Sequence, residues 1–182
     1  MKNNKILYLH GFASCGEGNK SSELKKYFAE ENILSPDLSP SPFDTIEMIE
    51  ELLKSESIGL IIGSSLGGFY ATYFAEKYQM KAVLLNPSTQ PWETLAAYVG
   101  WQQRFCDEEV FEFKSVYLEQ LKTLQVMPEK GKYLLLLQSE DEVLDYNKAQ
   151  SLYNKHKVIV EYGGNHRFEN IHDYMSMIEN FI

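Results

Sequence analysis

Short apolar runs alternate with helical patterns along most of the chain. The runs cover residues 5–9, 58–62, 81–85, 132–137 and 158–160. Their length and their content of Ile, Leu and Val are typical of buried strands. Between most of them, apolar residues recur every three or four positions, which indicates helices with one buried face. This alternation predicts a parallel sheet with right-handed crossovers.

A weaker strand candidate lies at residues 32–38. Pro36 interrupts it, and a proline cannot donate to a central strand, so we expect a short strand near the edge of the sheet. With this strand, the pattern predicts an α/β fold: a three-layer sandwich around a mostly parallel sheet of about six strands.

The alternation stops between residues 86 and 132. No strand pattern is evident there, and the segment is longer than the usual connection of about 2–6 residues. Residues 91–101 and 109–124 have helical spacing. We therefore predict a single domain over residues 1–182, with residues 87–131 forming a small helical cap insertion. The alternative is two ordinary surface helices that cover the sheet.

Charge and cysteine content narrow the possible functions. The 182 residues carry a net charge of -9, which argues against nucleic acid and anionic membranes as partners. No long apolar run is evident, so a soluble, cytoplasmic protein is expected. Cys15 and Cys106 form no Cys-x-x-Cys pair, which predicts free thiols in a reducing compartment and no structural metal site.

A Gly-x-Ser-x-Gly motif follows the apolar run at residues 58–62. Residues 63–68 read GSSLGG, and a helical pattern begins directly after them. A buried strand before the motif and a helix after it are the context of a nucleophile elbow, a tight turn that exposes a serine hydroxyl. Ser65 holds the central position of the motif and is the candidate nucleophile. Ser64 is expected to face the turn and to take no part in the reaction.

Two further loops after strands carry the partners that such a serine needs. Asp141 follows the run at residues 132–137, and His166 follows the last strand. Because strand ends gather at one edge of a parallel sheet, Ser65, Asp141 and His166 are expected to converge there. The chain order Ser, Asp, His is that of the α/β-hydrolases. Asp145 is an alternative acid, but its place before a helical pattern favours a helix N-cap.

The loop at residues 10–14 follows the first strand. The backbone N–H of Phe12, together with that of Leu66 after the nucleophile, is predicted to form an oxyanion hole. His10 and Gly11 shape this loop and are candidate substrate contacts. Trp92 and Tyr98 of the insertion are candidate substrate contacts too, although aromatic residues there are more often packing residues.

These motifs resemble those of the α/β-hydrolases, and more narrowly the small bacterial YqiA-like esterases. The resemblance rests on residues 8–12 (YLHGF), 63–68, 141–146 (DEVLDY) and 163–166 (GGNH). It implies an α/β-hydrolase fold and a serine esterase that needs no cofactor. By this resemblance Ser65 is the nucleophile, His166 the base and Asp141 the orienting acid. One departure is the lead-in to Asp141, Gln138-Ser139-Glu140, where many relatives have a glycine.

The expected function is hydrolysis of small-molecule acyl esters through a Ser-His-Asp triad and an acyl-enzyme intermediate. An acyl-thioesterase with the same triad is the nearer alternative, and a non-catalytic binding protein on a hydrolase scaffold is the farther one, because fold alone does not give activity. The exposed aromatic residues of the insertion leave both a monomer and a homodimer open.

Overall fold

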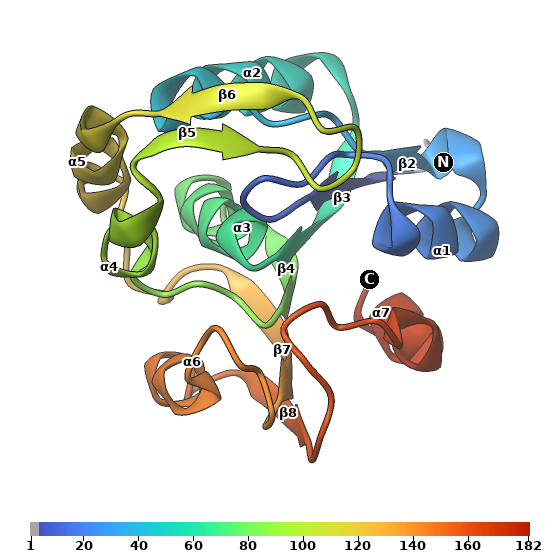
Figure 1. Ribbon diagram of the computed structural model, residues 1–182. Helices are drawn as coiled ribbons and strands as arrows, with labels where there is room; N and C mark the ends of the chain where they lie inside the picture. The colour runs from blue at the N-terminus through green and yellow to red at the C-terminus, as the bar shows by residue number, and fades with distance from the viewer. Residues whose placement is uncertain (1–3) are drawn as a thin grey trace.

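A six-stranded parallel sheet forms the centre of the molecule, seen in a computed structural model that describes residues 4–182 (Figure 1). The strands are β1 (Lys5–Leu9), β2 (Ile33–Leu34), β3 (Ile58–Ser64), β4 (Lys81–Leu85), β7 (Lys132–Gln138) and β8 (Lys157–Glu161). Their order is β2-β1-β3-β4-β7-β8. The predicted strands are confirmed, and the weak candidate is a two-residue edge strand. The strand order reverses between β1 and β3, the kind of place where α/β folds bind ligands.

Helices cover both faces of the sheet (Figure 1). The helices are α1 (Asn19–Phe28) and α7 (Met175–Phe181) on one face, and α2 (Pro42–Ser55), α3 (Leu66–Tyr78) and α6 (Tyr146–Leu152) on the other. Each face of the sheet has its own hydrophobic core, and successive side chains of β1 point alternately into one core and the other. Leu7 belongs to the same core cluster as Ile49 of α2, whereas Ile6 belongs to the cluster that contains Leu24 of α1 and Ile178 of α7. Among residues 4–182, no helix has the length and apolarity required to cross a membrane.

The segment between β4 and β7 is not the all-helical insertion that the spacing predicted. It contains α4 (Pro91–Thr94), the 3-10 turn η2 (Ala96–Tyr98), an antiparallel hairpin of β5 (Gly100–Gln103) and β6 (Val110–Phe113), and α5 (Ser115–Thr123). In a helix over residues 109–124, Val110 and Phe113 would lie on one face. In the strand, Val110 is 58% exposed and Phe113 is 1% exposed, because side chains alternate with a period of two.

A disulfide joins Cys15 to Cys106, so the prediction of free thiols is wrong. Cys15 lies on the loop after β1 and Cys106 at the tip of the hairpin, with 6.2 Å between their Cα atoms. The two cysteines are 91 residues apart, and no spacing rule shows that these loops meet. The argument from free thiols to a reducing compartment therefore does not hold.

Removing this disulfide is expected to destabilise the fold strongly. Opening a loop of 91 residues restores conformational entropy to the unfolded chain, equivalent to about 4.6 kcal/mol in the loop-entropy model. Urea unfolding with and without a reductant measures the difference in the free energy of unfolding. The double variant Cys15→Ser/Cys106→Ser is the control, since the reductant should not change its midpoint. Identical midpoints for the oxidised and reduced wild type would contradict the prediction.

Candidate active site

Ser65 lies on a strained turn between β3 and α3. Its φ is 54° and its ψ is −119°, a backbone conformation that residues other than glycine rarely adopt. The turn requires glycines around it. A Cβ on Gly63 would lie 2.3 Å from the carbonyl oxygen of Gly67, and a Cβ on Gly67 would lie 2.0 Å from that of Leu9. The motif therefore has the geometry of a nucleophile elbow, with the serine at the carboxyl end of the sheet.

The imidazole of His166 lies next to the Ser65 hydroxyl. His166 is on the loop after β8, and its Nε2 is 3.0 Å from Ser65 Oγ. The backbone N–H of His166 donates to Oε2 of Glu142 over 2.9 Å, which fixes the backbone of this loop at His166. Glu142 therefore has a structural role beside the site.

Asp141 contacts the other ring nitrogen of His166. The distances from Nδ1 to the two carboxylate oxygens are 2.9 and 3.0 Å, and the Asp141 side chain is only 2% exposed. Its Oδ1 also accepts the backbone N–H groups of Val143 and Leu144, at 2.9 and 2.8 Å. Because an ionised carboxylate only accepts, Nδ1 carries the proton, and the lone pair of Nε2 faces the serine.

Asp145 has a different role. It is the N-cap of α6, where its Oδ1 accepts the backbone N–H of Asn147 over 3.0 Å. Hydrogen bonds from Asn147 lower the pKa of this exposed carboxyl. The N-cap interpretation is therefore confirmed.

The loop at residues 10–14 packs against Ser65. A Cβ on Gly11 would lie 3.2 Å from Ser65 Cβ and 3.7 Å from Ser65 Oγ. Leu66 is the first residue of α3, so its N–H has no acceptor inside the helix. Among residues 4–182, neither this N–H nor that of Phe12 donates to a protein acceptor. Phe12 and Leu66 both line the cleft that contains Ser65.

His10 is a buried residue that uses both ring nitrogens within the protein. Its Nε2 accepts the backbone N–H of Leu38 over 2.9 Å, so Nδ1 carries the proton and donates to the carbonyl of Gly11 over 2.8 Å. Burial lowers its pKa, which favours the neutral ring. His10 lines a small cavity of about 80 Å³ and not the cleft at Ser65. It shapes the loop and has no ring nitrogen left for a substrate.

The cleft around Ser65 has a volume of about 640 Å³. Of the candidate substrate contacts, Gly11 and Tyr98 line it. Trp92 is not among its lining residues in the described part of the chain. Its ring packs edge-on against Phe69 beside the core, with 6.2 Å between the ring centroids, so the structure gives it a packing role.

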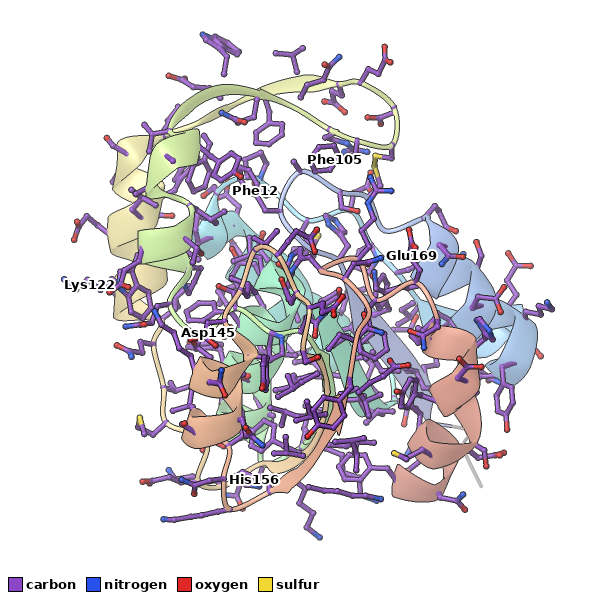
Figure 2. The ribbon with its side chains drawn as sticks, turned by 60° about the horizontal axis from the view of Figure 1, so that its bottom comes forward. Phe12, Phe105, Lys122, Asp145, His156 and Glu169 are labelled. Carbon is purple, nitrogen blue, oxygen red and sulfur yellow. A yellow bond between two sulfur atoms is a disulfide. The ribbon has the colours of Figure 1, made fainter. Side chains whose placement is uncertain are left out.

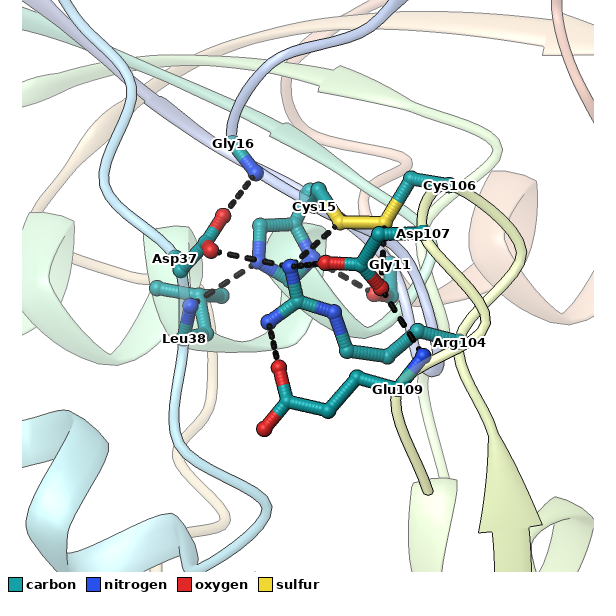
Figure 3. Close-up of polar contacts among 10 residues, drawn as sticks. Gly11, Cys15, Gly16, Asp37, Leu38, Arg104, Cys106, Asp107 and Glu109 are labelled. Carbon is teal, nitrogen blue, oxygen red and sulfur yellow. Dashed lines mark hydrogen bonds and ion pairs between the residues drawn. A yellow bond between two sulfur atoms is a disulfide. The ribbon is translucent and has the colours of Figure 1, made fainter. Parts of the chain in front are cut away.

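The hairpin tip is fastened to the loop at residues 10–16 (Figure 3). Besides the disulfide, the backbone N–H of Phe105 donates to the carbonyl of Ala13 over 2.8 Å. Arg104 donates from Nη2 to Cys15 Sγ, Asp37 and Asp107, at 2.7, 2.9 and 2.8 Å. The hairpin therefore forms part of the wall of the cleft, and its position is coupled to the loop that contains Phe12.

One group of side chains in the described residues has the composition of a metal site. It consists of Cys15, Cys106 and Asp107. The two sulfur atoms are bonded to each other, and the guanidinium of Arg104 already contacts Cys15 and Asp107. A cation at this place would meet a positive charge, so the group does not fit a metal ion.

Two buried side chains that the sequence reasoning did not assign to the site hold the loop of His166. Asn86, at the end of β4, donates to the carbonyl of Asn165 over 3.0 Å and accepts the backbone N–H of Gln138 over 2.9 Å. The Oε1 of Gln138 accepts the N–H of Asn165 over 2.9 Å. Their position directly at strand ends was the available signal, since polar residues there tend to be buried near the site.

The model of an uncharacterised protein family, UPF0227, matches residues 5–182. The UPF0227 protein YcfP of Salmonella paratyphi A is 25% identical over 186 residues, with 97% of each chain covered. Among solved structures, α/β hydrolase domain-containing protein 10 from mouse has a TM-score of 0.74 at 15% identity and covers 97% of this chain and 88% of its own. Est1E from Butyrivibrio proteoclasticus has a TM-score of 0.73 at 14% identity, covering 96% and 84%. The predicted α/β-hydrolase fold is confirmed.

Proposed function

The chain belongs to the UPF0227 family, YqiA-like members of the α/β-hydrolase superfamily, and we propose that it is a serine esterase that hydrolyses small-molecule acyl esters. One observation carries the proposal: His166 Nε2 lies 3.0 Å from Ser65 Oγ while its Nδ1 lies 2.9 Å from Asp141. A hydroxyl that contacts an imidazole, which in turn contacts a carboxylate, is the arrangement of the Ser-His-Asp triad in acyl transfer.

The first half-reaction forms an acyl-enzyme. Ser65 Oγ attacks the ester carbonyl carbon while His166 Nε2 takes the hydroxyl proton. The carbonyl oxygen becomes an oxyanion, which the backbone N–H groups of Phe12 and Leu66 stabilise. The tetrahedral intermediate then collapses, the bond to the leaving alcohol breaks, and His166 returns its proton to that oxygen.

The second half-reaction releases the acid. Water replaces the alcohol, His166 removes its proton, and the resulting hydroxide attacks the acyl carbon. Collapse of this second intermediate restores the Ser65 hydroxyl and frees the carboxylic acid. Asp141 stabilises the imidazolium that forms in each half-reaction, and it keeps the ring in the tautomer that can accept a proton. The ester and water are the only reactants in these steps.

We propose that residues 87–131 act as a cap over the reacting groups. Thr94, Leu95 and Tyr98 of this segment line the cleft together with Phe12 and Leu66. Their apolar surfaces give the acyl chain a place next to Ser65. The tether from the hairpin tip to the loop of Phe12 holds this wall in place.

A fluorophosphonate probe and a short chromogenic ester test the proposed function. The probe is expected to label the protein at Ser65, identified by mass spectrometry of the modified peptide, and 4-nitrophenyl butyrate is expected to turn over. Comparing 4-nitrophenyl butyrate with a butyryl thioester separates an esterase from a thioesterase. Absence of both labelling and hydrolysis would reject a serine hydrolase and favour a binding protein on this scaffold.

A further inference from the structure

Two cationic side chains line the cleft on the side of α1. Lys20 lies in the first turn of α1, and Arg167 lies on the loop after β8. Asn19 Nδ2 donates to the carbonyl of Glu169 over 3.3 Å, so these two segments are joined beside the cleft. Figure 2 shows Glu169 on this side of the molecule, next to α1. Lys20 and Arg167 therefore share a cleft with Ser65.

Lys20 has no anionic partner among residues 4–182. The other lysines of α1, Lys25 and Lys26, each pair with a glutamate, whereas Lys20 makes neither a salt bridge nor a hydrogen bond through its ammonium group. It is partly buried, and burial lowers its pKa to about 8, although Glu169 raises it. Burying an ammonium group without an anionic partner is energetically unfavourable. An anionic ligand that pairs with Lys20 would offset this cost.

Tyr8 is a second unpartnered group in the same cleft. The residue is only 5% exposed, it lines the cleft, and its hydroxyl makes no hydrogen bond to residues 4–182. A buried phenol normally has a hydrogen-bond partner. Burial also raises the pKa of Tyr8, so the group remains an O–H donor. The Tyr8 hydroxyl, on strand β1, can therefore donate a hydrogen bond to a ligand in the cleft. This observation is independent of Lys20.

No acidic residue of the cleft forms a salt bridge with Lys20 in the described part of the chain. Glu17 is paired with Lys25, and Glu142 accepts the backbone N–H of His166. Glu169 raises the pKa of Lys20 through its charge alone. The first turn of α1 contains no acidic residue, so the partial positive charge of the helix N-terminus favours an anion beside Lys20. A carboxylate can accept hydrogen bonds from both the Lys20 ammonium and the Tyr8 hydroxyl.

We propose that Lys20 and Tyr8 bind a carboxylate on the leaving alcohol of the ester, with Arg167 beside it. This specificity inference rests on the proposed function. Arg167 directly follows His166, which returns the proton to the leaving oxygen, so the alcohol lies on the Lys20 side of Ser65. The apolar wall of Leu95 and Tyr98 is left for the acyl chain. The preferred substrates are thus acyl esters of hydroxy acids.

A matched pair of chromogenic esters tests this assignment. The carboxylated substrate is 3-butyryloxy-4-nitrobenzoate, and the neutral one is 2-nitrophenyl butyrate. Each kcat/KM is divided by the rate at which hydroxide cleaves that ester, and the ratio of the two corrected values is the readout. Lys20→Met is expected to lower this ratio about 10–100-fold, mainly through KM, because a charge-assisted hydrogen bond is lost. Tyr8→Phe is expected to lower it several-fold.

The control is Lys26→Met on the same helix, where the side chain is 80% exposed and should leave the ratio within about twofold of the wild type. Lys20→Arg should retain most of the preference, because it keeps the charge. A ratio that Lys20→Met leaves unchanged would overturn the proposal. Equal losses on both esters would also overturn it, since they would indicate a structural role for Lys20.

A binding measurement separates this proposal from the proposed function. Calorimetry on the Ser65→Ala protein compares the Kd of 3-hydroxy-4-nitrobenzoate with that of 2-nitrophenol, with and without the Lys20→Met change. A carboxylate preference that disappears with Lys20→Met supports the site even if no ester is hydrolysed. Affinities that do not depend on Lys20 would reject the site even in an active esterase.

Discussion

The Ser65→Ala protein is expected to hydrolyse 4-nitrophenyl butyrate with a kcat about 10⁶-fold below that of the wild type. The loss should be this large because the nucleophile, base and orienting acid act as a unit, so removing the hydroxyl removes the acyl-enzyme route. Residual turnover would come from binding and the two N–H donors alone. Steady-state kinetics at saturating ester, with the fluorophosphonate probe as a second readout, measure the effect.

Ser64→Ala is the matched control. Ser64 is the buried last residue of β3 and the neighbour of Ser65 in the same motif, so the variant perturbs the turn without removing the nucleophile. Its kcat should stay within about fivefold of the wild type, a limit expected for a residue that makes no contact in the transition state. If Ser64→Ala lost activity and Ser65→Ala kept it, the assignment of the nucleophile would be reversed.

Asp141→Asn is expected to lower kcat by about 10⁴-fold without unfolding the protein. The amide oxygen of asparagine can still accept the backbone N–H groups of Val143 and Leu144, so the loop should persist. The amide nitrogen is a donor, however, and His166 can then accept from it only through an unprotonated Nδ1. Its Nε2 would carry the proton and could no longer act as the base toward Ser65.

Asp145→Asn is the comparison that makes the test specific. Asparagine is as good an N-cap as aspartate, so α6 should keep its first turn. Both variants remove one carboxylate from the same loop, yet only Asp141 contacts the imidazole. Activity of Asp145→Asn should therefore remain near that of the wild type. A larger loss at Asp145 than at Asp141 would identify Asp145 as the acid that orients His166.

The fold could be predicted where one physical pattern dominated the sequence. The strands at residues 58–62 and 132–137 are continuous apolar runs because both faces of a parallel sheet are covered. The convergence of Ser65, Asp141 and His166 followed from topology, since each residue comes directly after a strand of that sheet. The distances between their side chains needed the coordinates.

The insertion could not be predicted in the same way. Residues 110–113 read Val-Phe-Glu-Phe, a run of four that fits either a helix or a half-exposed strand, and long-range packing decides between them. The contact between Cys15 and Cys106 depends on the hairpin, and the spacing of the cysteines along the chain does not indicate it. That Lys20 lacks an anionic partner likewise could not be predicted, because it depends on how distant segments pack around the cleft.

The position of the insertion has an evolutionary consequence. Ser65, Asp141 and His166 follow strands β3, β7 and β8, whereas residues 87–131 follow β4, which supplies none of these three groups. A change of length in this segment would therefore leave the strands that align the proposed nucleophile and base in place, provided that the tether from the hairpin tip to the loop after β1 is kept. Under the proposed function, acyl preference and reactivity would then be encoded in separate stretches of one gene.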